Sequence, residues 1–158
     1  MNAGASSFDV RAALEVIRAL PDGCRVGITG TQQGLNSVQY YWASFVVELL
    51  WHKMWELHEG HCVGADEEVT RIVRRRRGDR EGPKIYGHPS NMPDRTSVLE
   101  VDVMYPPLPP LERNHVIVDV SHILVALPHE REERLRSGTW ATVRYARQQN
   151  RPIIYIYP

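Results

Sequence analysis

The fold is decided by residues 25–34, which read RVGITGTQQG. The first half of this stretch is rich in β-branched residues, and the second half is rich in glycine and small polar residues. A strand that leads directly into a glycine-rich turn and a helix is typical of the first unit of an α/β domain. The stretch therefore predicts a parallel sheet covered by helices.

Strands and helices alternate along the rest of the chain. Apolar residues at helical spacing predict a short helix over 7–20 and a long helix over 37–57. Further helices are predicted over 65–77, 110–118 and 137–149. Further strands are predicted within 60–64 and over 84–88, 122–127 and 153–157. Residues 89–110 contain six prolines, so the only regular element expected there is a strand over 97–104.

This order of elements predicts one domain over residues 1–158, in which the helix over 7–20 precedes a core over 24–158. The expected class is α/β, a Rossmann-like three-layer sandwich with a parallel-dominated sheet of about five strands flanked by helices. In such sheets, ligands bind outside the carboxyl ends of the strands.

Composition and charge exclude several classes of protein. The 19 basic residues balance 19 acidic ones, whereas a general binder of nucleic acid carries a basic excess, so nucleic acid is possible only through a local patch. The two cysteines and seven histidines show no metal-ligand spacing, so neither a metal nor a cofactor is expected. No apolar run of membrane-spanning length occurs, and we expect a soluble, cytoplasmic protein without membrane contact.

Two turns carry the strongest candidate binding residues. Gly30-Thr31-Gln32 follows the first strand, and Ser137-Gly138-Thr139 begins the last helix. Glycine lets a phosphate approach the backbone, and a helix start offers free N–H groups and positive potential. The same residues also suit a tight turn and an ordinary helix cap, so the pattern leaves both interpretations open.

Four further residues are candidates because of where they lie along the chain. Arg113-Asn114 precedes the strand over 122–127, and an arginine can bind a phosphate through two hydrogen bonds. His61 and His88 each end a predicted strand, which would place them at the same edge of the sheet. The alternatives are a solvated surface pair and two structural histidines.

Four blocks in order resemble the Rossmann-like SLOG group, which includes the DNA-processing Smf/DprA proteins, the lonely-guy phosphoribohydrolases and the small YspA-like domains. The blocks are Val26–Thr31, Gly60-His61-Cys62-Val63-Gly64-Ala65-Asp66, Pro110–Asn114, and Ser137–Thr142 followed by Asn150–Ile153. The resemblance covers about residues 24–158. It implies a nucleotide-derived ligand whose phosphate meets the last helix, with Arg113 facing the pocket. It also adds Gly60, Gly64 and Asp66 to the candidate binding residues.

Three functions stay open at this point. The first is a module that binds or senses a small nucleotide. The second is a nucleotide N-glycosidic hydrolase, although Ala141 and Thr142 stand where lonely-guy enzymes carry a catalytic glutamate. The third is a single-strand nucleic acid binder, against which the neutral charge counts.

Self-association, most simply as a dimer, is also expected. The predicted long helix carries Tyr40, Tyr41, Trp51 and Trp55 beyond its core stripe, and surplus aromatic surface is typical of interfaces.

Overall fold

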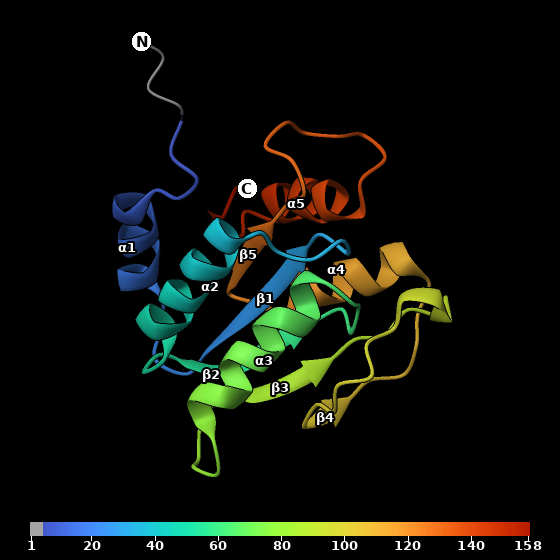
Figure 1. Cartoon of the computed structure of the whole chain (residues 1–158), viewed down its shortest axis with the longest axis horizontal. Helices are drawn as coiled ribbons and strands as arrows, with labels where there is room; N and C mark the ends of the chain where they lie inside the picture. The colour runs from blue at the N-terminus through green and yellow to red at the C-terminus, as the bar shows by residue number, and fades with distance from the viewer. Residues whose placement is uncertain (1–4) are drawn as a thin grey trace.

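The structure, a computed structural model, describes residues 5–158 and has three layers around one sheet (Figure 1). The sheet has six strands, all parallel, in the order β4-β3-β2-β1-β5-β6. The strands are β1 (Cys24–Gly30), β2 (Met54–Glu59), β3 (Lys84–Gly87), β4 (Val103–Met104), β5 (Ile123–Leu127) and β6 (Ile153–Tyr155). The predicted α/β class is confirmed, with one strand more than expected.

Five helices cover the two faces of the sheet. They are α1 (Val10–Ala19), α2 (Ser37–Leu50), α3 (Ala65–Arg77), α4 (Pro110–Val120) and α5 (Gly138–Gln148), with a short 3-10 turn η1 at Pro93–Arg95. The first three helices share one apolar core with β1, while α4 and α5 enclose a second core against β5 (Figure 1). Burial on both faces explains why β5 is wholly apolar.

The long helix predicted over 37–57 is wrong in its last third. Helix α2 ends at Leu50, and β2 follows a short turn and lies between β1 and β3 in the sheet. Met54 and Leu57 are buried in the core, and their spacing of three residues fits one face of a continued helix. A strand in the middle of a sheet covered on both faces buries side chains at either spacing. Periodicity over so few residues cannot separate the two, so burial in the sheet decided the outcome.

The aromatic surface on which the expected dimer was based is divided between α2 and β2. Tyr40 and Tyr41 lie on α2 and are exposed, but Trp55 lies on β2, where 68% of it is exposed. The four aromatic residues therefore do not belong to one helix.

The Pro-rich segment between β3 and α4 is also less regular than predicted. Only Val103–Met104 of the strand expected over 97–104 pairs with β3. Ser97 N–H instead donates to the carbonyl of His61 at 2.9 Å, which ties the segment to the loop after β2.

The direction of the connections reverses at β1. From β1 the chain builds outward through β2, β3 and β4, and it then returns to add β5 and β6 on the other side. Crevices form at such switch points, at the carboxyl ends of the strands. Within residues 5–158 no helix has the length and apolar character that crossing a bilayer requires.

Candidate functional site

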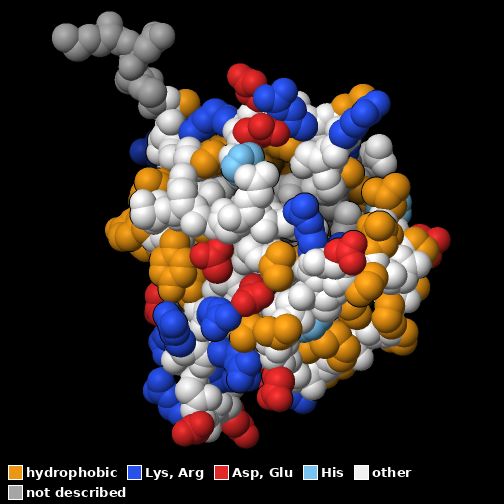
Figure 2. Space-filling view, turned by 45° about the vertical axis from the view of Figure 1, so that its right-hand side comes forward, with side chains coloured by type: hydrophobic (Ala, Val, Ile, Leu, Met, Phe, Trp, Pro, Cys, Tyr) orange, Lys and Arg blue, Asp and Glu red, His pale blue; other side chains and the backbone are white. Residues whose placement is uncertain are grey.

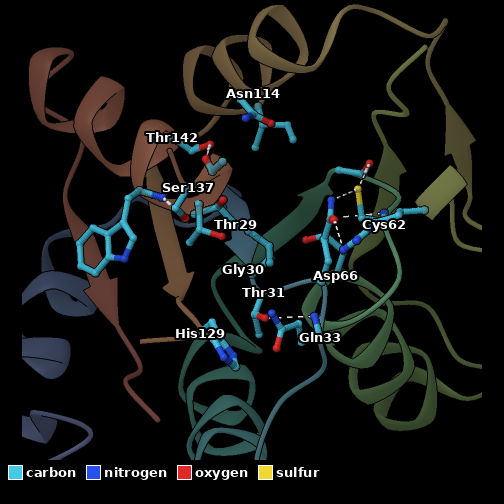
Figure 3. A pocket seen from close by; sticks show the side chains of 18 of the residues that line it. Thr29, Gly30, Thr31, Gln33, Cys62, Asp66, Asn114, His129, Ser137 and Thr142 are labelled. Atoms are coloured by element: carbon cyan, nitrogen blue, oxygen red, sulfur yellow. Dashed lines mark hydrogen bonds between the residues drawn. The ribbon is translucent and has the colours of Figure 1, made fainter. Parts of the chain in front are cut away.

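A cavity of about 390 Å³ lies at the carboxyl ends of the strands, between the turn after β1 and the start of α5 (Figure 3). Most of the candidate residues from the sequence line it: Gly30, Thr31, Gln32, Gly60, Asp66, Arg113, Asn114, Ser137, Gly138 and Thr139. His61, Gly64 and His88 do not. Its size is in the usual range for a site that binds a small molecule.

The start of α5 forms one wall of the cavity. Ser137 caps the helix, and its hydroxyl accepts a hydrogen bond from Trp140 N–H at 3.3 Å. The first two N–H groups of the helix, on Gly138 and Thr139, have no intrahelical acceptor. A Cβ atom placed on Gly138 would meet no atom within 4 Å. The cavity therefore reaches the backbone of the helix start.

The opposite wall contains Gly30, which belongs to a closely packed contact between β1 and α3. A Cβ atom on Gly30 would overlap the Cβ atom of Ala65, the first residue of α3. Gly64 has a φ of +89°, and a side chain there would overlap the carbonyl of Thr31. The same carbonyl accepts a hydrogen bond from Ala65 N–H at 2.8 Å. Both glycines allow α3 to approach β1, and Gly64 does so without reaching the cavity.

Arg113 links the ends of two strands. Its side chain is buried, and its Nη1 donates hydrogen bonds to the carbonyls of Gly60, after β2, and His88, after β3, the second at 3.0 Å. Its Nε donates to Asn114 Oδ1 at 2.8 Å. The guanidinium therefore adds positive charge to the cavity wall and also satisfies two buried carbonyls.

Asp66 is a buried carboxyl group at the start of α3. Its Oδ2 accepts a hydrogen bond from Cys62 N–H at 3.3 Å (Figure 3). Burial, together with the negative charge of Glu59, raises the pKa of Asp66 to about 7, although Arg113 opposes the shift. A group with this pKa can give or take a proton at neutral pH.

His88 belongs to a buried aromatic cluster rather than to the cavity. Its ring stacks on Tyr105 with centroids 4.5 Å apart, and its Nε2 lies 2.9 Å from His58 Nδ1. Burial, with the nearby charges of His58 and Arg113, lowers the pKa of His88 to about 4, so the ring is neutral at pH 7. Of the two interpretations of this histidine, the structure favours the structural one.

Several charged residues that line the cavity carry no sequence signal of a binding role. Arg95 comes from η1, and Arg136 and His129 come from the loop between β5 and α5. With Arg113, three arginines face two acidic residues, Asp66 and Glu130. This balance favours an anionic ligand. Arg136 directly precedes Ser137, which is the one sequence signal that could have identified it.

The run Arg74–Arg77 lies far from the cavity. These residues form the last turn of α3, whose first turn borders the cavity wall. In Figure 2 basic side chains gather at the lower left of the molecule, around this end of α3. Arg76 stacks on Trp51, and Arg77 pairs with Asp102 at 2.6 Å, so part of the run has a structural role.

Known proteins resemble this chain in structure, whereas the sequence comparisons find no match. No protein-family model and no curated protein sequence match the chain. A molybdenum cofactor binding protein from the phototrophic bacterium Rippkaea orientalis superimposes with a TM-score of 0.62 at 20% identity, covering 85% of this chain and 74% of that one. DNA processing protein A from Helicobacter pylori, which binds single-stranded DNA, superimposes with a TM-score of 0.53 at 17% identity, covering 92% of this chain and 67% of that one.

The chain has the fold of the SLOG group. The DNA-processing proteins are one of the groups that the four sequence blocks resemble, so that resemblance is confirmed for the fold. A third structure, the structural-genomics target TM1055, superimposes with a TM-score of 0.57 at 15% identity, covering 82% of this chain and 72% of that one. Identities this low leave the function to be argued from the cavity.

Proposed function

We propose that this chain binds a small nucleotide-derived ligand and holds its phosphate at Ser137-Gly138-Thr139. The open approach to Gly138 carries the proposal, because it leaves two N–H groups at a helix start free for an anion. Gly30-Thr31-Gln32 lies opposite, and Arg113 and Arg136 add positive charge. A cofactor-binding protein and a protein that binds single-stranded DNA share this fold, which agrees with a phosphate-bearing ligand.

A nucleotide N-glycosidic hydrolase is the second candidate. Thr142, at a position where a catalytic glutamate is expected, donates its hydroxyl proton to the carbonyl of Gly138 at 2.9 Å and has no acid–base role. Asp66 lines the cavity and has a pKa of about 7, so it is the residue that could exchange a proton with a bound nucleotide. Binding of single-stranded DNA has less support, because Arg74–Arg77 lie at the far end of α3. A dimer also remains a prediction.

Calorimetry with adenosine monophosphate, with product analysis by chromatography, tests the proposal. Arg136→Ala should weaken binding about tenfold, because a charge-assisted hydrogen bond contributes about 1.5 kcal/mol. Arg136 is exposed and has no ion pair within residues 5–158, so the variant should fold normally. The matched control is Arg75→Ala on the exposed face of α3, which should bind like the wild type.

The results separate the candidates. Binding without turnover supports the binding module, and release of adenine supports the hydrolase. If Arg75→Ala weakened binding while Arg136→Ala did not, the cavity would be the wrong site. A nucleotide screen by thermal shift that found no ligand would contradict the proposal as a whole.

A further inference from the structure

A second cavity of about 270 Å³ adjoins the first. Its lining comes from the loops after β1, β2 and β3, from η1 and from the start of α4, whereas α5 borders only the first cavity. The two cavities share four residues: Gln32, Cys62, Arg95 and Arg113. They are therefore neighbouring compartments of one crevice.

The shared residues form a partition held by weak polar contacts. Arg95 Nη1 donates to Gln32 Oε1 at 3.0 Å. Cys62 Sγ lies 3.8 Å from Gln32 Nε2 and 3.7 Å from Arg113 Nη1. A ligand that extends from one cavity into the other would cross this partition beside two arginines.

His61 lines the second cavity and not the first, and a buried carboxylate lies beside its imidazole. It lines the second cavity and is 94% buried, with 6% of its surface exposed. Behind it lies Glu59, which is 1% exposed. The backbone N–H of His61 donates to Glu59 Oε2 at 2.6 Å, and His61 Nδ1 lies 3.5 Å from Glu59 Oε1.

The buried carboxylate favours the charged form of this imidazole. Glu59 Oε1 has no hydrogen-bond partner within the described residues, and a buried carboxylate requires a compensating positive group. The interaction with Glu59 accordingly raises the pKa of His61. His61 is held in place by this pair, so it cannot turn away from the cavity without leaving the carboxylate uncompensated.

The charges of the second cavity are arranged to bind an anion. His61, Arg95 and Arg113 line it, and Asp94 is its one acidic residue among the residues that the structure describes. Met92 and Pro110 add apolar surface beside these charges. The helix start that would hold the first phosphate lies outside this cavity, so an anion bound here would be separate from that phosphate.

We infer, on the basis of the nucleotide site proposed above, that the ligand carries a second anionic group separate from the first, which binds between His61, Arg95 and Arg113. The ligand class is thus a nucleotide with two separated phosphates rather than a simple monophosphate. The ribose or an equivalent spacer lies over the partition at Gln32 and Cys62.

Calorimetry with two probes tests this inference, adenosine monophosphate and adenosine 3′,5′-bisphosphate. The bisphosphate should bind the wild type about tenfold more tightly, which is the contribution of one charge-assisted hydrogen bond. His61→Asn should remove this advantage and leave the affinity for the monophosphate unchanged. Asparagine tolerates the φ of 53° at this position, but it leaves Glu59 without its positive partner, so thermal unfolding checks that the variant is folded.

A second variant acts in the opposite direction and does not touch the core. Asp94 is exposed and lines only the second cavity, so Asp94→Lys should strengthen bisphosphate binding severalfold and leave monophosphate binding unchanged. The matched control is Asp79→Lys, the same exchange at an exposed position beyond the far end of α3, which should change neither affinity.

The outcomes distinguish this inference from the proposed function. If both probes bound the wild type equally, the second anion site would be overturned and the nucleotide site would stand. The inference would also fail if Asp79→Lys strengthened bisphosphate binding as much as Asp94→Lys, since the effect would then come from net charge. If neither probe bound, the second site would be overturned together with the nucleotide site.

Discussion

The two walls of the cavity contain the same kind of turn, a glycine followed by threonine, but differ in what surrounds the glycine. A Cβ atom added to Gly30 would overlap the Cβ atom of Ala65 and would lie 3.0 Å from the carbonyl oxygen of Leu127. Gly138 faces open space. The first glycine is required for packing between β1 and α3, and the second leaves room for a ligand. A glycine-rich turn therefore indicates that something lies close to the backbone, but the turn alone does not show whether this is another part of the protein or a ligand.

The largest expected effect is on the packed wall. Gly30→Ala should lower the free energy of unfolding by about 2 kcal/mol, because an added methyl group must displace α3 or β5. Chemical denaturation measures the change. Adding Ala65→Gly removes the methyl group that it meets, so the double variant should recover part of the loss beyond additivity. If Gly30→Ala were as stable as the wild type, Gly30 would tolerate a side chain as Gly138 does, and the two walls would not differ in packing.

A smaller effect is expected on the open wall, and on binding rather than on folding. Gly138→Val places a side chain where the phosphate would approach, so nucleotide affinity should fall at least tenfold, or about 1.4 kcal/mol. The free energy of unfolding should stay within about 0.5 kcal/mol of the wild type, since nothing lies within 4 Å of the added Cβ atom. Gly138→Ala should weaken binding less. Unchanged affinity in the valine variant would argue against a ligand at this helix start.

The smallest effect concerns the cap of the same helix. Ser137→Ala removes the acceptor for Trp140 N–H and should cost about 1 kcal/mol of stability, as loss of a helix cap usually does. Thermal unfolding without ligand measures it. Ser137→Asp keeps an acceptor and serves as the control for stability, while its negative charge should repel an anionic ligand. If the aspartate variant bound nucleotides as well as the wild type, the ligand would not lie at the cap.

Local signals predicted the parts of the fold that depend on neighbouring residues. The strand and turn over 25–34 and the charge order of α3 are properties of short stretches, and the structure has both elements where they were expected. The boundary between α2 and β2 depends on which face of Met54 and Leu57 is buried, and only the sheet determines that. The helical pattern therefore predicted seven residues too many, 51–57 rather than an end at Leu50.

In the candidate site, too, local signals were predictable from the sequence and long-range contacts were not. The sequence predicted the two turns and Arg113 as candidates, because glycine, hydroxyl groups and arginine suit a phosphate, and the structure places them around one cavity. It could not show that Arg113 also binds two carbonyls, nor that Arg95 would reach the cavity from η1. Those contacts join residues that lie far apart in the chain, and a single sequence contains no measure of such distances.

The burial of Asp66 predicts that binding of the proposed ligand depends on pH. Its pKa of about 7 leaves the carboxyl group partly ionised at neutral pH. A phosphate in the same cavity disfavours the carboxylate and raises this pKa further, so we expect the protein to take up a fraction of a proton for each anion that binds. The apparent binding enthalpy would then depend on the ionisation enthalpy of the buffer, and the cavity would hold its ligand more tightly as the surroundings became more acidic.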